Sequence, residues 1–137
     1  MTVRAFLALL LLAAAAPLRA EWIDADGPPK GFFSTLSRST VYYYDPATIT
    51  RDGNFRTVWE IHDLDDKGSS GERSVLAQVE YDCADKRMRT LKATGRSRGM
   101  ARGEIIPLRG TVSDWSFLRP GKDDEVFFKI LTAVCAS

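Results

Sequence analysis

The residues with the greatest chemical reactivity in this 137-residue chain are two cysteines, Cys83 and Cys135, and a single histidine, His62. Paired cysteines carry out redox chemistry in Cys-x-x-Cys motifs, and cysteines bind zinc together with histidine or with further cysteines. Here the two cysteines are far apart in the sequence, and His62 is remote from both. We therefore expect a structural disulfide between Cys83 and Cys135 and no metal site; two unpaired buried thiols are the alternative.

His62 could act as a general base, because Glu60 and Asp63 stand close to it in the sequence. No Gly-x-Ser-x-Gly, phosphate-binding loop or His-Glu-x-x-His motif accompanies it, so no nucleophile or catalytic metal is marked. A lone histidine at the end of a strand is more often ordinary surface. The sequence thus predicts no catalytic residue, no cofactor and no enzyme.

An acidic stretch beginning at Asp63 partly matches a calcium-binding loop. Asp63, Asp65 and Gly68 fall at positions one, three and six of such a loop. Lys67 falls at position five and Ser74 at position twelve, where oxygen ligands of acidic residues are needed. The mismatch favours an exposed acidic hairpin loop over a calcium site.

Residues 86–102 form a basic segment that contains no acidic side chain. Its basic residues are Lys86, Arg87, Arg89, Lys92, Arg96, Arg98 and Arg102. Such a segment could bind an anionic partner: a sulfated glycan, lipopolysaccharide or an acidic stretch of a protein. The alternative is a solvated surface whose arginines pair with Asp63, Asp65, Asp66 or the acidic residues near the C-terminus. Nucleic acid is disfavoured because no aromatic residues are interleaved with these charges.

The first 20 residues have the layout of a secretory signal peptide. Arg4 supplies a positive start, residues 5–16 are apolar and uncharged, and Pro17 breaks that run shortly before Ala20. The apolar run is too short to span a bilayer comfortably. We expect cleavage after Ala20, which leaves residues 21–137 as the mature domain, without a transmembrane segment. Export also argues against a nucleic-acid partner.

The mature chain has the size and charge of one small domain. Residues 1–20 contain Arg4 and Arg19 and no acid, so the mature chain keeps 17 basic and 18 acidic side chains, and its net charge indicates no partner. The length suffices for one hydrophobic core and is too short for two ordinary domains. Two cysteines in an exported chain of this size usually pair, and closing the loop between them is worth about 4 kcal/mol on the chain-entropy model.

Most of the mature chain carries the alternation of apolar and polar residues that is typical of β-strands. Extended segments are expected around residues 32–33, 41–44, 48–51, 54–62, 74–83 and 87–93, with weaker ones at 104–108 and 111–118. Asp45-Pro46 predicts the edge of the sheet or a β-bulge at this point, because proline has no N–H to donate to the hydrogen-bond ladder of a sheet. Asp52-Gly53 predicts a tight hairpin.

Three glycines, Gly95, Gly99 and Gly103, follow the last clear strand. They predict a flexible basic stretch at this point of the chain.

The C-terminal segment changes from the strand period to the helix period. Phe127, Ile130, Leu131, Val134 and Cys135 share one face of an α-helix; a final strand is the alternative. Residues 75, 77, 79, 81 and 83 share one face of a strand, so both cysteines lie on surfaces that must become buried. The sequence predicts an α+β fold: a single antiparallel sheet of about six strands, with a C-terminal helix packed on one face and linked to it by the disulfide.

Several aromatic residues could form a binding platform, namely Tyr42, Tyr43, Tyr44, Trp59 and Trp115. In a small sheet protein most aromatics are needed for the core. Only those on the face away from the helix therefore remain candidates.

The residues placed in this way resemble the surface-adhesin protein E family of Gram-negative bacteria. The matching stretches are residues 41–49, Asp52-Gly53, residues 58–61, residues 74–83, then Arg87 and Arg89, and the closing block of Trp115, Pro120-Gly121 and Cys135. They occur in order over nearly the whole mature chain. The resemblance implies an antiparallel sheet with a helix held against it, display at the cell envelope, adhesion to host matrix or serum proteins, and a homodimer.

Residues and resemblance together predict a non-enzymatic protein of the periplasm or the cell surface. It is expected to bind a macromolecular partner, a protein or an anionic glycan, through the sheet surface and the basic segment. A rival interpretation is a periplasmic accessory subunit of an envelope complex, because no cysteine stands near Ala20 to carry a lipid anchor. A small periplasmic hydrolase or redox enzyme is a third.

Overall fold

The computed structural model describes residues 20–26, 40–121 and 124–137 of the chain. The expected signal peptide up to residue 19 and the expected extended segment at Phe32 and Phe33 lie outside the described residues.

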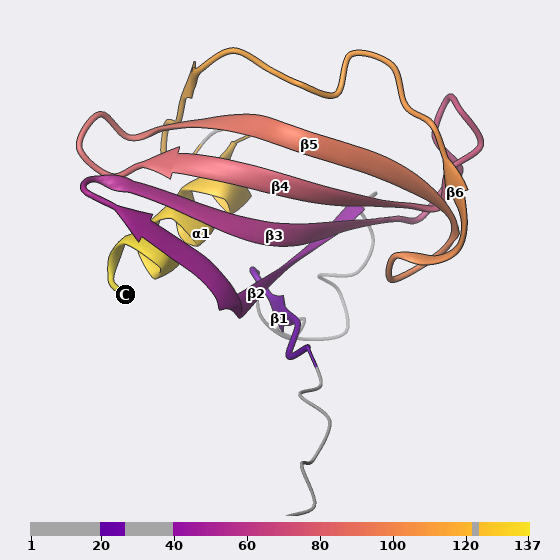
Figure 1. The fold of residues 1–137 in the computed structure, drawn as a ribbon, viewed down its shortest axis with the longest axis horizontal. Coiled ribbons are helices and arrows are strands. Elements are labelled where there is room, and N and C mark those ends of the chain that lie inside the picture. The colour runs from indigo at the N-terminus through magenta and orange to yellow at the C-terminus, as the bar shows by residue number, and fades with distance from the viewer. Residues whose placement is uncertain (1–19, 27–39, 122–123) are drawn as a thin grey trace, which may run out of the picture.

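The described chain forms one antiparallel sheet with a helix against one face (Figure 1). The elements are β1 (Ile23–Asp24), β2 (Thr40–Asp52), β3 (Phe55–Leu64), β4 (Ser74–Asp82), β5 (Arg87–Arg98), β6 (Arg102–Ile106), β7 (Ser116–Phe117) and α1 (Glu125–Cys135). The first six strands lie side by side in chain order, and β7 pairs with the beginning of β5. This is the expected α+β fold.

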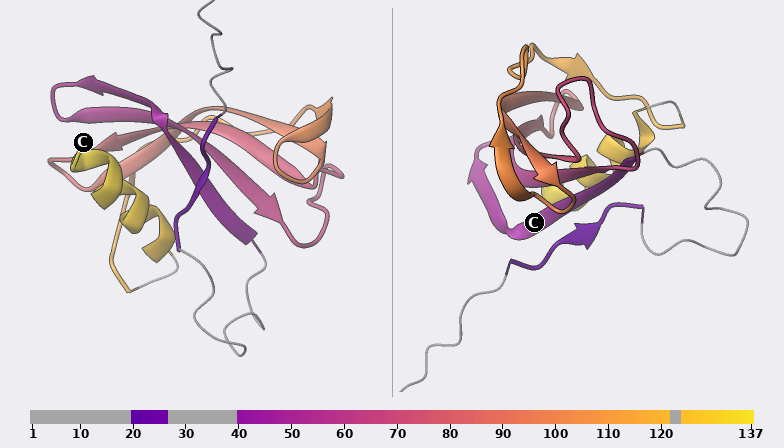
Figure 2. Two further views of the ribbon diagram at one scale, coloured as in Figure 1. Left: turned by 90° about the horizontal axis from the view of Figure 1, so that it is seen from below. Right: turned by 90° about the vertical axis from the view of Figure 1, so that its right-hand side faces the viewer.

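Helix α1 packs its apolar stripe against what we call the inner face of the sheet. Ile130, Leu131 and Val134 are buried, and Phe127 and Cys135 pack against the same core. The helical period of the sequence therefore predicted the element correctly, and the alternative of a final strand is wrong. Figure 2 shows α1 beneath one end of the sheet and the β5–β6 hairpin at the opposite end.

Strand β4 supplies the matching apolar row and ends at the disulfide. Ala77, Val79 and Tyr81 are at most 1% exposed and lie in the core beneath α1. Cys83 follows directly after this row and is bonded to Cys135, with the two Cα atoms 5.8 Å apart. The bond joins the end of β4 to the last residue of α1, so sheet and helix are covalently connected as expected.

Strand β3 turns its more polar residues toward the helix. The register pairs Glu60 with inward-facing Ala77. By the alternation of a strand, the inner row of β3 is Arg56, Val58, Glu60 and His62. Burial confirms this placement, because Glu60 is 0% exposed and Arg56 is 4% exposed. The opposite row, which contains Trp59, belongs to the outer face of the sheet.

The interruption expected at Asp45-Pro46 is a bulge within one long strand, β2. Pairing with β3 shifts register between Asp45 and Thr50. The Asp52-Gly53 turn follows, and Gly53 has a φ of 55°, which a residue with a side chain adopts only at a cost. The bulge and the hairpin are both confirmed.

The flexible basic stretch is a wrong expectation. Strand β5 continues to Arg98 instead of ending near residue 93, and β6 begins at Arg102. The glycines mark close contacts within a paired hairpin: a Cβ on Gly95 would lie 2.9 Å from the Ile106 carbonyl oxygen and 2.9 Å from Glu72 Cβ. Of the other weak candidate, residues 111–118, only β7 is a strand.

Removing the disulfide should loosen the helix from the sheet. Replacing Cys83 and Cys135 together with serine is expected to lower the free energy of unfolding by about 4 kcal/mol, because the unfolded chain regains the freedom of a long loop. Urea denaturation followed by circular dichroism measures the change, with reduced wild-type protein as the control. An unchanged midpoint would contradict the role given to the bond.

Candidate functional site, the curled basic hairpin

The β5–β6 hairpin ends in an unusual turn. The Arg102 N–H donates to the Gly99 carbonyl at 3.3 Å, and the two residues between them, Met100 and Ala101, have φ values of 55° and 54°. Consecutive positive φ values are typical of type I′ hairpin turns, which usually carry Asn-Gly. Residues with ordinary side chains avoid this region, at a cost of roughly 1–2 kcal/mol each.

Two side chains from neighbouring strands hold this turn in place. Asp63 and Ser74 are paired opposite each other on β3 and β4. The Met100 N–H donates to Asp63 Oδ1 at 2.8 Å, and the Ala101 N–H donates to Ser74 Oγ at 2.9 Å. The Ser74 hydroxyl in turn donates to the Arg98 carbonyl at 2.6 Å. The hairpin thus folds back over the outer face and is tied to the two strands beneath it.

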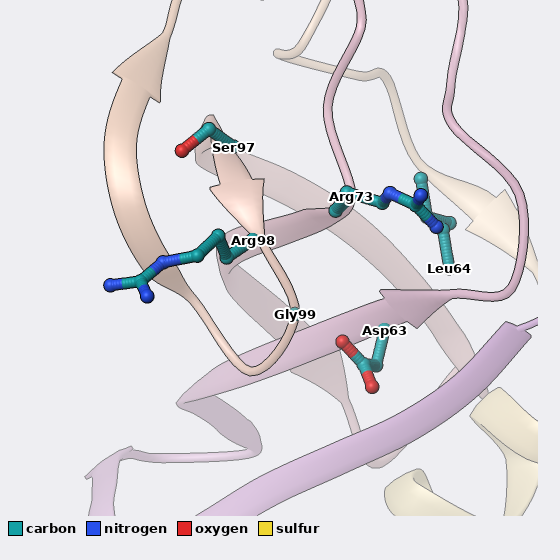
Figure 3. A pocket seen from close by; sticks show the side chains of 6 residues that line it. All are labelled: Asp63, Leu64, Arg73, Ser97, Arg98 and Gly99. Carbon is teal, nitrogen blue, oxygen red and sulfur yellow. The ribbon is translucent and has the colours of Figure 1, made fainter.

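A hollow of about 270 Å³ lies beside the turn. Its lining residues are Asp63, Leu64, Arg73, Ser97, Arg98 and Gly99. In Figure 3 the guanidinium groups of Arg73 and Arg98 extend to opposite sides of this hollow, and the Asp63 carboxylate points toward Gly99. The hollow is open and bordered by charge, which suits an extended ligand better than a small enclosed one.

The basic segment divides into two ends with different surroundings. At the end near the disulfide, Arg87 donates from Nε to Asp82 at 2.9 Å, and Arg89 donates from Nε to Glu80 at 2.8 Å. Both guanidinium groups also lie over the Trp115 ring, 4.4 and 4.5 Å from its centroid. Their charges are therefore already paired, and their main contribution is to hold the segment around Trp115 against the sheet.

The carboxylate of Asp82 shows how tightly this end is organised. Burial opposes its ionisation, but hydrogen bonds from Arg87 and from the backbone N–H groups of Asp85 and Ala84 outweigh that effect and lower the pKa. Lys86 belongs to the same end, where its Nζ donates to the Cys83 carbonyl at 2.8 Å.

At the hairpin end, the arginines lack acidic partners among the described residues. Arg98 and Arg102 are exposed and directly opposite each other on β5 and β6, an arrangement in which like charges repel. Arg96 reaches the Gly103 carbonyl at 3.4 Å, and its Nε is buried without a partner in the described part of the chain. Lys92, exposed near the middle of β5, also forms no ion pair there.

The acids that the sequence suggested as partners form no ion pair with these arginines among the described residues. Asp63 binds the Met100 N–H, and the acids that pair with the basic segment are Glu80, Asp82 and Asp85. Arg73, which lies before β4 and outside the basic segment, joins the hairpin end through a bond from its N–H to the Arg96 carbonyl. Sequence reasoning missed Arg73 and Ser74, because only the strand register brings them to this place.

The calcium-loop residues serve as supports for the hairpin. Asp63 accepts the Met100 N–H and Ser74 is 0% exposed beneath the turn. Within residues 20–26, 40–121 and 124–137, no three His, Cys, Asp or Glu side chains gather in a way that could hold a metal ion.

The aromatic residues divide between the two faces. Tyr42 and Tyr44 pair with inner-row residues of β3 and pack against the core. Tyr43 and Trp59 belong to the outer face by alternation, and Trp115 lies over the outer-face arginines. Only the last three therefore remain candidates for a binding platform.

His62 lies between the sheet and the helix, beside a buried carboxylate. Its Nε2 is 2.8 Å from Glu60 Oε2, and the Tyr81 hydroxyl donates to Glu60 Oε1. The His62 ring stacks edge-on with Tyr42 at 4.8 Å and lies 5.9 Å from Phe127 of α1. A buried carboxylate needs such donors to remain in the core, so His62 and Tyr81 together satisfy Glu60 on the inner face of β3.

The Glu60 carboxylate also affects the tyrosines around it. Burial, the negative charge of Glu60 and the hydrogen bond to Glu60 together raise the pKa of Tyr81 well above its usual range. Burial raises the pKa of Tyr42, and Glu60 adds to that effect.

The raised pKa of Tyr81 predicts a loss of stability in alkali. The unfolded chain releases this proton near pH 10, whereas the folded protein retains it, so the free energy of unfolding should fall as the pH rises above about 10. In Tyr81→Phe this component should vanish, and stability at neutral pH should fall by about 1–3 kcal/mol because Glu60 loses a donor. Denaturation curves across the alkaline range measure both, with Tyr44→Phe as the control. Equal behaviour of the two variants would contradict the inference.

Comparison with solved structures shows the same fold in one group of bacterial proteins. Crystal form II of Haemophilus influenzae protein E superposes with a TM-score of 0.62 at 15% sequence identity, covering 88% of this chain and 93% of that one. A second structure of Haemophilus influenzae protein E gives 0.60 at 14% identity, covering 84% and 93%. Protein E from non-typeable Haemophilus influenzae gives 0.56 at 15%, covering 86% of both chains.

The sequence itself identifies the family. Residues 33–136 match the model of the surface-adhesin protein E family, and the chain belongs to this family. None of the curated proteins compared with it matches in sequence. The chain is therefore an adhesin-like protein of the exported or cell-surface kind, and its family implies binding of a macromolecule.

No helix in the described part of the chain is long and apolar enough to cross a membrane.

Proposed function

We propose that this protein is a non-enzymatic adhesin-like protein that binds a protein or an anionic glycan of the host through the hairpin end of the basic segment and the adjoining outer face of the sheet. The observation that carries the proposal is the pair Arg98 and Arg102. Both side chains are exposed and unneutralised among the described residues, and they lie opposite each other at the end of the sheet that α1 leaves uncovered.

Only part of the basic segment is available for a partner. Arg87, Arg89 and Lys86 are engaged by Asp82, Glu80 and the Cys83 carbonyl, so a ligand would have to displace existing bonds to reach them. Arg96, Arg98 and Arg102, together with Lys92, keep charge that a partner could neutralise. Arg73 adds to them from the opposite side of the hollow.

Export of the protein fits its covalent structure. Disulfides form and persist in oxidising compartments, and the bond between Cys83 and Cys135 is present. We expect the apolar leader to be removed after Ala20. Protease treatment of intact cells distinguishes the cell surface from the periplasm. Digestion of the protein supports surface display, and protection supports the periplasmic accessory role.

Reversing the charge of the hairpin end tests the proposed function. Arg98→Glu combined with Arg102→Glu should weaken binding to plates coated with basement-membrane extract or serum proteins by about tenfold or more, because like charges then face the partner. The matched control is Arg51→Glu combined with Arg109→Glu, which makes the same charge change at exposed positions outside the hairpin. Surface plasmon resonance on the same coatings gives the affinities.

If both double variants lose the same binding affinity, the loss results from the change in net charge and not from the hairpin surface. Unchanged binding in the hairpin variant would remove this surface from consideration.

A further inference from the structure

We propose that Asp63 and Ser74 are positioning residues, which hold the β5–β6 turn in the shape that recognises a sulfated polysaccharide. The inference rests on the proposed function and deepens it, because it names the class of ligand and the residues that prepare the surface for it.

The backbone of the turn shows that its shape is imposed by its surroundings. Met100 and Ala101 both occupy the positive-φ region, at 55° and 54°, without the Asn-Gly sequence that normally allows it. Strain of this kind persists only when neighbouring structure over-determines it, and it gathers at functional sites. The neighbouring structure here is the pair of side-chain oxygens, Asp63 Oδ1 and Ser74 Oγ, that accept hydrogen bonds from the Met100 and Ala101 N–H groups.

The supports are built to be rigid. Ser74 is 0% exposed, and its hydroxyl accepts from the Ala101 N–H while it donates to the Arg98 carbonyl. A Cβ on Gly99 would stand only 3.0 Å from Asp63 Oδ1. The strand that carries Arg98 is therefore fixed on both sides of the turn, which reduces the conformational entropy lost when its side chain binds a ligand.

The sign of the charge on Asp63 argues for this role. A carboxylate beside Arg73 and Arg98 weakens the positive field that an anionic ligand meets. A surface that relied on charge alone would be better without it. The hydrogen bond from the Met100 N–H explains why Asp63 is present, since a charged acceptor makes a stronger hydrogen bond than a neutral one.

The chemistry of the hairpin end favours sulfate groups on a carbohydrate. Its cations nearest the hollow, Arg73, Arg96, Arg98 and Arg102, are all arginines, whose planar fork binds oxyanions through two parallel hydrogen bonds. Protein partners usually bury a central aromatic anchor, and residues 96–102 contain no aromatic side chain. Arg73 and Arg98 border an open hollow and extend to different sides of it, as an extended chain with repeated anionic groups requires.

The test compares variants of Asp63 for binding to a size-defined heparin oligosaccharide at physiological ionic strength. Asp63→Ala removes a negative charge, so charge alone predicts tighter binding, whereas the positioning role predicts binding weaker by about five- to tenfold. Asp63→Asn keeps an acceptor for the Met100 N–H, so it should bind more tightly than Asp63→Ala. Asp63→Ala combined with Met100→Asn and Ala101→Gly should recover the affinity, because Asn-Gly forms the turn without support.

Gly99→Ala provides a charge-neutral check in case Asp63→Ala fails to fold. The new Cβ would press on Asp63 and should weaken heparin binding while leaving the thermal midpoint of the core nearly unchanged. Affinity in Asp63→Ala equal to or above that of the wild type would overturn the positioning role, as would full affinity in Gly99→Ala.

Two further results separate this inference from the proposed function. If the Arg98 and Arg102 double variant keeps its binding, the proposed function fails as well; if that variant loses binding but Asp63→Ala does not, only the positioning role fails. No heparin binding by the wild type, or equal binding of a non-sulfated polyglutamate of the same charge, would overturn the assignment to sulfated polysaccharide.

Discussion

The packing of the apolar stripe of α1 against the inner face of the sheet is the constraint on which the rest of the structure depends. A sheet this small cannot bury both of its faces by itself, and the helix gives the inner face a partner made of Ile130, Leu131 and Val134. The bond between Cys83 and Cys135 then prevents the helix from separating from that face. Because α1 covers the inner face at one end of the sheet, the outer face and the end beyond the helix are free to carry charge.

The sequence predicted most of the architecture because the decisive patterns are local. The alternation through Tyr81 to Cys83 and the helical spacing up to Cys135 each place a sulfur on a surface that must be buried, and the disulfide follows from the two together. The Asp52-Gly53 hairpin and the bulge after Asp45 are likewise local, because they depend on turn chemistry and on the missing N–H of proline.

The hairpin end could not be predicted in the same way. Its glycines look like signs of flexibility in the sequence, whereas Gly95 is small because the Ile106 carbonyl and Glu72 approach it across the sheet. The turn at Met100 lacks the usual Asn-Gly at its two central positions, and its supports come from β3 and β4. The basic segment was recognisable as a charge anomaly, but its division into paired and unpaired arginines depends on the register against Glu80 and Asp82. All of these contacts join residues of separate segments of the chain, so the local pattern of residue types does not predict them.

The disulfide has a further consequence for what proteolysis can do to this protein. Cys83 and Cys135 enclose β5, β6, β7 and nearly all of α1. A peptide-bond break anywhere between them opens a ring without releasing a fragment, because the two pieces remain joined through sulfur. Cleavage by a protease in an exposed connection such as residues 107–115 would therefore leave the two pieces covalently joined until a reductant broke the disulfide.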